Sequence, residues 1–428
     1  MFDALVNAFR APDIRRRILF ILGMLVIVRM LANVPVPGID RQALEGVIGG
    51  NGFLQMLNLF SGGGLENFSI IALGVNPYIN ASIIMQLMTG VVPRLQQLSR
   101  EGEYGRNKIN QYTRYLTVPL AILQSYGYLA LLSSPQNGVV QDFDLTSFTT
   151  LTQIISLTAG TVLLMWIGEL ITERGIGNGI SFIIFAGIVA GLPAAVATFL
   201  AAPELAAAIL FGGLAVASVA IIVYIQEGQR RIPIQYASRV RGRRMYQGGA
   251  TFLPLRVNQA GVIPIIFAIS ILLFPVQLAT YFSNSGGIVE DVATVIIDWL
   301  SQGSPLYAIV FFLLVVGFTY FYTAFTFKPA ETADQLRKNG GFIPGIRPGA
   351  PTRDYLSKVV YRISLAGAIF LGVVAVSPII FGMIFAGSVF GSFALGGTAI
   401  LIVVSVVVET MKQLEAQLMM RNYEGFIR

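Results

Sequence analysis

Long apolar stretches recur along the chain, with shorter polar segments between them. Most of these stretches approach the roughly 20 residues that an α-helix needs to cross the hydrocarbon core of a bilayer. Ten of them are predicted to span a membrane, at residues 18–34, 78–92, 115–133, 151–171, 180–200, 205–226, 258–281, 305–327, 361–384 and 394–411. Because this number is even, both ends of the chain are expected on the same side of the membrane.

One segment, Ser61–Val92, interrupts the pattern of simple spans. It begins with three glycines near its start, continues with a short apolar run at Ser69–Val75, and breaks at Asn76-Pro77. Proline breaks the chain because it lacks a backbone donor and restrains the residue before it. The apolar run that follows carries amides, which are tolerated at membrane depth only where they face protein or a water-filled cavity. We predict a half-helix that enters from one side, turns and continues into a span lining an aqueous path. A re-entrant loop that only packs is the alternative.

The composition supports a membrane protein. Of the 428 residues, 55% are hydrophobic and 12% are charged, and the mean hydropathy is +0.71, whereas soluble proteins carry about 25% charged residues. We therefore predict an all-α polytopic membrane protein. The chain has no Cys and no His, which excludes disulfides and metal sites with thiolate or imidazole ligands and removes the commonest general base.

The charges indicate how the chain is oriented. The segments predicted to face outward are 35–77, 134–150, 201–204, 282–304 and 385–393. They contain nine acidic residues and one basic residue, Arg41. Of the 29 Lys and Arg residues, all but Arg41 and the span-embedded Arg29 border the inner side, which leaves 27 there. Lys and Arg gather on the cytoplasmic side of membrane proteins, so we expect both termini in the cytoplasm, and the net charge of +7 does not indicate nucleic-acid binding.

The spans divide the chain into two halves of five. We predict a cytoplasmic segment at 1–17, an N-terminal half at 18–200 and a C-terminal half at 201–428. An odd number of spans per half inverts the second half relative to the first, as in inverted-repeat transporters, and places the pathway between them. This inference rests on hydropathy, because the two halves show no clear echo in sequence. The stretch Leu192–Pro203 is either a hinge between the halves or an ordinary loop.

Two of the predicted inner loops, 228–257 and 328–360, are unusually long. The first contains seven Arg and no acid around a Gly-rich middle, which indicates a projecting, ribbon-like loop. The second contains a rigid Gly/Pro-rich piece, Gly341–Pro351, with Arg347 near its centre. Topology signals and solvation explain the charge, but they do not explain the apolar residues among it, namely Ile232, Tyr236, Tyr246, Phe252, Phe342 and Ile343. We therefore favour a docking surface for a partner.

Catalytic chemistry has little support in this sequence. The carboxylates nearest to span interiors are Glu169 and Glu409, both close to cytoplasmic ends and without an evident partner. The turn at Ile176–Gly179 is a weak candidate for a phosphate cradle, because no Lys-Ser/Thr follows. No enzyme and no cofactor are predicted. Mid-membrane positions carry amides, Ser and aliphatics, which favours a passive, gated passage, with a secondary transporter built on broken helices as the alternative.

Several long motifs are distinctive, namely SGGGLENFSIIALGVNPYINASIIMQL, EYGRNKINQYTRY, GELITERGIGNGISFIIFAGIVAGLP, NQAGVIPIIFAISILLFP, KPAETADQLRKNGGFIPGIRPG and FGSFALGGTAILIVVSVVVETMKQLEAQL. They resemble the SecY family, the central subunits of the bacterial protein-conducting channel, or Sec translocon. The resemblance covers nearly the whole chain. It implies a ten-helix clamshell of two five-helix halves, with an hourglass pore between them for unfolded secretory proteins and a lateral exit into lipid.

The resemblance also implies roles for particular residues. An aliphatic ring at the waist of the pore is expected from Val75, Ile79, Ile180, Ile184, Ile266 and Ile402. A half-helix plug is expected over 60–73, with Phe60, Gly62, Gly63, Gly64, Leu65, Asn67, Phe68, Ile70 and Ile71. The lateral gate, between spans 2, 3, 7 and 8, is expected to have polar contacts from Gln86, Gln124 and Asn258. Where this chain has Val75-Asn76 the family often has Ile-Met, and this amide is expected to soften the seal.

The resemblance further implies partners and a location. The two long inner loops are expected to dock the ribosome or the SecA ATPase, through Arg239, Arg241, Arg243, Arg244 and Arg347. Small membrane subunits similar to SecE and SecG are expected to brace the clamshell. Signal sequences, unfolded preproteins and membrane lipids complete the expected partners, and the bacterial plasma membrane is the expected location.

Overall fold

The computed structural model describes residues 11–50, 58, 61, 63–133, 139–140, 144, 147–200, 205–236, 239–241, 244–246, 250–282, 287–300, 304–384 and 396–425. An α-helix coincides with each of the ten predicted spans, which confirms the predicted all-α class. These helices are α2 (Pro12–Leu31), α5 (Asn76–Val91), α7 (Glu103–Leu132), α8 (Phe148–Arg174), α9 (Gly179–Leu200), α10 (Leu205–Glu227), α11 (Ile263–Phe282), α13 (Pro305–Thr326), α15 (Ala350–Ile384) and α17 (Gly396–Gly425). Within the described residues, α7, α8, α13 and α15 contain stretches long and apolar enough to cross a membrane, and α9, α10 and α11 contain shorter apolar stretches.

Proline sets the start of several helices. Pro at the first or second position begins α2, α5 and α13, and also the short helices α6 (Pro93–Arg100) and α14 (Pro329–Lys338). A proline there loses no hydrogen bond, because the first amides of a helix have no partner inside it, and its φ already suits a helix. The break predicted at Asn76-Pro77 is therefore the beginning of α5.

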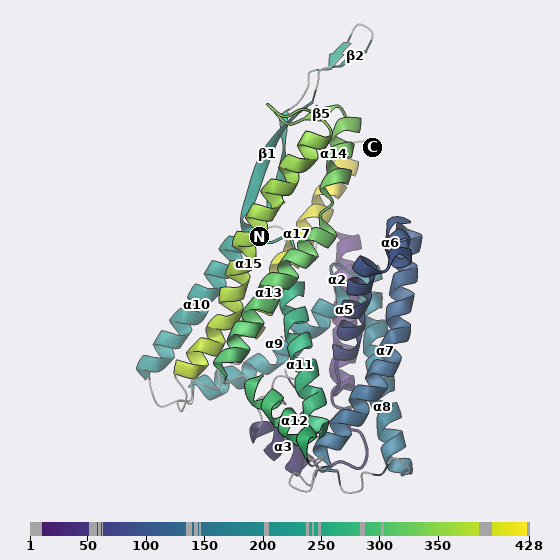
Figure 1. Ribbon diagram of the computed structural model, residues 1–428, viewed down its shortest axis with the longest axis vertical. Helices are drawn as coiled ribbons and strands as arrows, with labels where there is room; N and C mark the ends of the chain where they lie inside the picture. The colour runs from purple at the N-terminus through teal and green to yellow at the C-terminus, as the bar shows by residue number, and fades with distance from the viewer. Residues whose placement is uncertain are drawn as a thin grey trace.

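The helices form two groups that meet along two seams. Helices α2, α5, α7, α8 and α9 pack together, and α10, α11, α13, α15 and α17 form the second group (Figure 1). The groups touch where α5 and α7 contact α11, and again where α9 contacts α17. The two predicted five-helix halves are thus present. The stretch Leu192–Pro203, predicted as a hinge or loop, is helical as far as Leu200.

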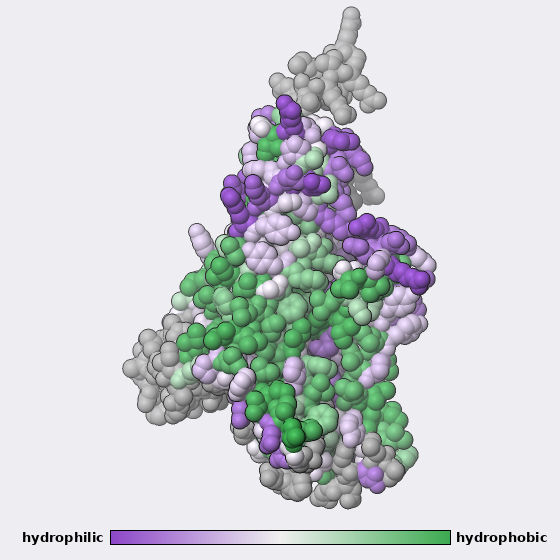
Figure 2. All heavy atoms as spheres, viewed as in Figure 1, coloured by the Kyte–Doolittle hydropathy of each residue, from purple (hydrophilic) through white to green (hydrophobic). Residues whose placement is uncertain are grey.

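Polar side chains gather at one end of the molecule. Figure 2 shows a hydrophilic cap above a broad hydrophobic belt. The cap lies over α6, α14 and the starts of α7 and α15, and we call it the basic end (Figures 1 and 2). The short helices α3 (Arg41–Gly50) and α12 (Ile288–Trp299) lie at the opposite end (Figure 1). This separation agrees with the charge asymmetry of the predicted loops.

The segment predicted as a half-helix over 60–73 is different in the structure. Residues 63–75 form consecutive turns. Gly63 (φ 82°), Phe68 (φ 40°) and Gly74 (φ 60°) lie in the left-handed region, which a right-handed helix does not contain. The short apolar run at Ser69–Val75 favours a helix, but it does not reveal the left-handed residues that prevent a regular one.

The two long loops form one folded unit at the basic end. Its strands are β1 (Gln229–Tyr236), β2 (Arg239–Arg241), β3 (Arg244–Tyr246), β4 (Ala250–Arg256) and β5 (Gly341–Phe342). Strand β1 pairs antiparallel with β4, and β2 pairs with β3, which confirms the ribbon predicted for the first loop. Strand β5 comes from the second loop and pairs with the other edge of β1, so the sheet order is β4-β1-β5.

A small apolar core holds this unit together. Ile232, Ile234 and Leu255 of the first loop are buried with Ile343 and Leu356 of the second loop and α15. We call the unit of β1–β5, α14 and the first turns of α15 the basic platform. The expectation that Ile232 and Ile343 belong to a docking surface is wrong, because each loop buries the apolar residues of the other.

Helix α15 connects the basic platform to the bundle. It has 35 residues, which corresponds to a length of about 50 Å. Its first turns contribute to the platform core, and its later turns pack along α13. The two helices approach closely at Gly372, where an added Cβ would lie 2.6 Å from Cδ2 of Phe312. Small residues permit such close approach between helices in membranes.

We therefore expect Gly372→Ala to destabilise the protein, because the methyl group collides with a packed ring. Overpacking of this kind typically costs about 1–3 kcal/mol. Thermal unfolding of the purified protein in detergent measures the effect. Gly317→Ala on α13 is the matched control, since nothing lies within 4 Å of the Cβ it would add. Equal melting temperatures for the two variants would contradict the close contact.

Candidate functional site

A cavity of about 330 Å³ lies between the two helical groups. Helices α5, α7, α8 and α9 contribute one part of its wall, and α11 and α13 contribute the other. Its polar residues include Asn107, Asn110, Arg114, Glu169, Glu173 and Asn178, from the portions of α7 and α8 nearest to the basic end and the turn before α9. Its aliphatic residues are Ile79, Ile180, Ile263 and Ile266. Polar residues from α7 and α8 thus face aliphatic residues from α5, α9 and α11 across the cavity.

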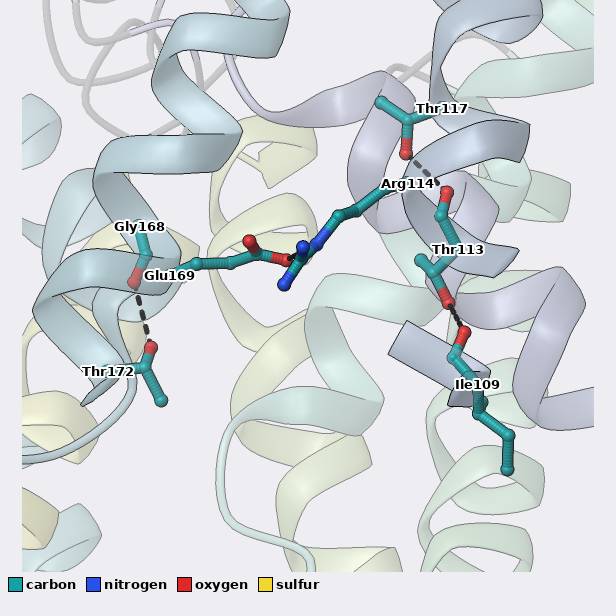
Figure 3. Close-up of polar contacts among 7 residues, drawn as sticks. All are labelled: Ile109, Thr113, Arg114, Thr117, Gly168, Glu169 and Thr172. Atoms are coloured by element: carbon teal, nitrogen blue, oxygen red, sulfur yellow. Dashed lines mark hydrogen bonds and ion pairs between the residues drawn. The ribbon is translucent and has the colours of Figure 1, made fainter. Parts of the chain in front are cut away.

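An ion pair crosses the polar wall from α7 to α8. Arg114 Nε donates to Glu169 Oε1 at 2.7 Å, and Figure 3 shows the two side chains extending toward each other. Neighbouring threonines are satisfied within their own helices, as Thr172 donates to the carbonyl of Gly168 at 2.8 Å (Figure 3). The pair joins two helices of the same half, so it braces this wall without closing the seam to α11.

The sequence does not predict this ion pair, because Glu169 has no evident partner near it in the chain. The two residues are 55 positions apart, so local spacing contains no sign of the contact. The order of the spans is the feature of the sequence that could have indicated this contact. Consecutive spans run antiparallel and usually lie side by side, and both charges lie near the ends of α7 and α8 that share the basic end.

The six residues of the predicted ring all lie in or against the main apolar core. Ile79, Ile180 and Ile266 line the cavity. Val75, Ile184 and Ile402 are buried, with at most 1% of their surface exposed. Val75 directly precedes α5, and the amide of Ile79, one turn later, donates to the carbonyl of Val75 at 3.0 Å. Three of the predicted residues thus meet at the apolar part of the cavity, and three lie in the surrounding core.

The turn segment that precedes α5 is buried and held on two sides. It pairs with the chain after α2, because Val36 N donates to Phe68 O at 2.9 Å and Ile70 N donates to Val34 O at 3.0 Å. On its other side it rests against α8, where a Cβ on Gly160 would lie 1.8 Å from the carbonyl oxygen of Ile70. Only glycine at this position of α8 permits such a contact.

Most residues predicted for the plug belong to this segment. Leu65, Phe68 and Ile71 are buried, with at most 1% exposed. The hydroxyl of Ser69 donates to the carbonyl of Gly64 at 3.0 Å, which closes the turn internally. The described plug residues Gly63, Gly64, Leu65, Asn67, Phe68, Ile70 and Ile71 lie in the turns, whereas Phe60 and Gly62 lie outside the described residues.

Of the predicted gate amides, Gln86 lines the cavity between the two helical groups. The hydrogen bonds of Gln86 and Asn258 differ from those expected. Gln86 Nε2 donates to Ser82 Oγ at 3.2 Å on the same helix. Asn258 donates to the carbonyl of Gly261 and accepts from its amide. Gln124 is buried, and its Nε2 has no partner among the described residues. The expected hydrogen bonds from Gln86 and Asn258 across the seam are replaced by bonds inside their own segments, because nearer polar groups are available.

Four of the five predicted docking arginines lie on the basic platform. Arg239 and Arg241 belong to β2 and Arg244 belongs to β3, while Arg243 lies outside the described residues. Arg347 is exposed between β5 and α15, and its carbonyl accepts a hydrogen bond from Thr352 Oγ1 at 2.8 Å. The backbone under Arg347 is thus held while its side chain faces solvent.

Comparison with known proteins shows where this architecture occurs. The model of the SecY family matches residues 69–411. "Protein translocase subunit SecY" of Streptomyces galbus is 46% identical over 445 residues, and the protein of the same name from Mycobacterium bovis is 45% identical over 450 residues, each match covering 100% of both chains.

Solved structures share the fold at lower identity. "The structure of a protein conducting channel" gives a TM-score of 0.64 at 18% identity, and "Sec61 in the Canine ribosome-channel complex from the endoplasmic reticulum" gives 0.63 at 18% identity. Both matches cover 93% of this chain and 91% of the other.

Two groups of apolar helices around a cavity with polar and aliphatic walls define a polytopic membrane protein. The matches over the full chain then specify the family. The chain belongs to the SecY family.

We expect Gly160→Ala to displace the turn segment, because the backbone carbonyl of Ile70 has no room to retreat from a methyl group. The chain has no Cys, so Asn67→Cys supplies a single thiol as a reporter. Its reaction with a water-soluble maleimide is expected to accelerate about ten-fold in the Gly160→Ala background, since local opening exposes it. Gly191→Ala, which adds a methyl group with nothing within 4 Å, is expected to leave the rate unchanged. Identical rates in both backgrounds would argue against the contact.

Proposed function

We propose that this chain forms the passage of a protein-conducting channel, through which unfolded secretory proteins cross a membrane and membrane proteins leave sideways into lipid. The observation that carries the proposal is the cavity between the halves, whose wall combines polar residues of α7 and α8 with Ile79, Ile180 and Ile266. The names of the relatives support it. The rival class of secondary transporters is not favoured, because the full-length relatives are named as translocase subunits.

We infer that the six aliphatic residues form the waist of the passage. A channel for unfolded chains must accept every kind of side chain, so specific binding groups would trap some of its substrates. Branched aliphatics offer no hydrogen bonds, and a constriction lined by them loses its water and blocks ions when empty. Flexible side chains in rotamer wells also yield to a passing chain. The six aliphatic side chains alone can therefore both seal the empty passage and admit a passing chain.

The turn segment before α5 is the proposed plug on the far side of the waist. It ends at Val75, directly before α5, and lies against Gly160, so we infer that it covers the end of the passage away from the basic platform. Its two hydrogen bonds to the chain after α2 are few enough to break when a substrate enters, because each typically contributes about 1 kcal/mol.

The seam of α5 and α7 with α11 is the proposed lateral gate. Gln86 and Asn258 bond inside their own segments, so parting the seam breaks neither of these hydrogen bonds. An interhelical hydrogen bond in a membrane contributes roughly 0.6 kcal/mol on average, and the seam is held instead by apolar packing. A hydrophobic signal sequence can replace that packing with its own.

The basic platform is the proposed docking surface for the motor. The chain holds no nucleotide-binding loop, so the energy for transport comes from a partner, either the SecA ATPase or the ribosome. One related structure is a Sec61 channel in a ribosome-channel complex. Small subunits similar to SecE and SecG complete the assembly. The excess of Lys and Arg at the basic end supports a cytoplasmic side for the basic platform and both termini, and the bacterial plasma membrane is the proposed location.

We expect Ile184→Asn to loosen the closed channel, because an amide at the waist stabilises water there. A shift of 1.4 kcal/mol toward the open state corresponds to about a ten-fold larger open population. Ion conductance across planar bilayers and export of proteins with defective signal sequences measure the effect. Val189→Asn puts the same amide on a more exposed part of α9 and serves as the control. If conductance and export both match the unmodified protein, Ile184 does not belong to the seal.

We expect Arg347→Glu to impair SecA-driven transport while the protein still inserts, because the reversed charge lies at an exposed and structurally supported position. ATP-dependent translocation into reconstituted vesicles should fall about ten-fold, the loss typical of breaking a charged contact. Arg353→Glu is the control, since Arg353 is exposed nearby but already pairs with Asp354 at 2.9 Å. Normal translocation by the Arg347→Glu protein would exclude this residue from docking.

A further inference from the structure

The short helix α12, at the end opposite to the basic platform, has three distinct faces. One face is apolar and exposed, with Ile288 (82%), Val292 (53%), Val295 (47%) and Trp299 (60%) at spacings of three and four residues. A second face is polar and consists of Glu290, Asp291, Thr294 and Asp298. The third face packs on α11 through Ala293, which is buried. An α-helix has 3.6 residues per turn, so each of these sets forms a continuous stripe.

An apolar groove of about 380 Å³ runs between α12 and the nearby end of α11. Four residues of α11 and five of α12 line it, and none of the nine has a polar side chain. Phe282 and Val289, one from each helix, are each about half exposed. The volume lies within the range of about 300–1,000 Å³ that is usual for small-molecule clefts. The groove therefore has the size and the chemistry to hold a hydrocarbon chain.

The position of α12 relative to the hydrophobic belt indicates what surrounds it. Figure 2 shows a hydrophobic patch at the lower margin of the belt, where α12 lies in Figure 1. Trp is enriched at the boundary between lipid and water, where its ring is partly apolar and partly polar, and Trp299 ends the exposed apolar stripe. A helix with one apolar and one charged face, at this depth, is typical of an interfacial helix that lies in the plane of the membrane.

We propose that α12 is such an interfacial helix and that the groove between α11 and α12 binds the acyl chain of a bilayer phospholipid. Because α12 lies at the margin of the hydrophobic belt (Figures 1 and 2), an acyl chain can reach the groove from the surrounding hydrocarbon. The polar stripe faces water. Nothing in this inference depends on what passes through the cavity between the halves.

Two features favour an acyl chain over other occupants. Nine lining residues are fewer than the roughly 20–30 per side found in a stable protein–protein interface, so a second copy or another subunit would gain too little area here. The charged residues on α12 are all acidic, and like charges repel, so an anionic headgroup is not the recognised part. The ligand is therefore recognised through its hydrocarbon chain, and neutral lipids suffice.

The proposed lipid site links the contact of α11 with α5 and α7 to the position of the bilayer surface. Helix α11 forms one side of the seam with α5 and α7, and α12 packs against its far end. An interfacial α12 holds that end of α11 at the membrane surface, so movement at the seam is expected to be largest toward the basic end.

The chain itself offers clean probes for this proposal. It has no Cys and only two Trp. Single-Cys variants Ile288→Cys and Val292→Cys report on the apolar stripe, and Asp291→Cys and Thr294→Cys on the same helix are matched controls on the polar stripe. All four positions are exposed in the isolated chain, so the substitutions are not expected to disturb folding. The full-length protein is placed in nanodiscs of neutral phosphatidylcholine and treated with a charged maleimide.

We expect Ile288→Cys and Val292→Cys to react about ten-fold more slowly than the two controls, because a thiolate forms poorly in hydrocarbon. In the Trp166→Phe protein, Trp299 fluorescence should be quenched by phosphatidylcholine brominated near the headgroup. A bimane label on Val292→Cys should be quenched by the same lipid, and anionic lipid should not be required.

Two results would overturn the proposal. Equal reactivity of all four cysteines would mean that α12 lies in water. Protection of Ile288→Cys and Val292→Cys without quenching by brominated lipid would mean that protein, rather than lipid, covers the groove.

Discussion

Non-helical backbone inside a membrane must have its polar groups satisfied by protein or water, since lipid offers no hydrogen bonds. The turns at residues 63–75 depend on this constraint. Their amides and carbonyls bond to one another and to the chain after α2, and α8 approaches them at a glycine. Because these turns are enclosed by protein, α5 can begin partway through the belt at Asn76. The cavity on the other side of Val75 and Ile79 follows from that late start.

The C-terminal half depends on one long helix, α15, which joins the basic platform to the helical bundle. Helix α15 continues from the basic platform through the bundle and packs along α13. The platform core, with Ile232, Ile343 and Leu356, fixes the two long loops to the first turns of this helix. A partner that binds the platform therefore acts on a rigid support and not on two independent loops. Helix α13 in turn contacts α11, so the platform and the seam belong to one connected set of helices.

Much of this organisation was predictable because lipid restricts the choices. The lengths of the apolar stretches predict the ten helices that coincide with spans, and Pro77 predicts the start of α5. The loops between spans were predicted less well. The sequence predicts a docking surface that includes Ile232 and Ile343, whereas in the structure each residue is buried by the opposite loop. The prediction fails because pairing between segments about a hundred residues apart leaves no local pattern in the sequence. The partner of Glu169 leaves no local pattern for a similar reason, because Arg114 lies 55 positions away. The bond from Gln86 to Ser82 is local, and it replaces the expected contact across the seam because the hydroxyl lies one turn away on the same helix. The aliphatic ring was accessible only through family resemblance, because one Ile on an apolar helix looks like any other.

The central claim is that a translocating chain passes the aliphatic waist between the two halves. Crosslinking tests it most directly, with single-Cys probes at Ile79, Ile184 and Ile402 and a secretory chain stalled during transport. Leu313, which is exposed on the belt side of α13, provides the control position. The account predicts crosslinks from all three waist positions to the stalled chain and none from Leu313. Crosslinks from Leu313, together with no crosslinks from the three waist positions, would contradict the account.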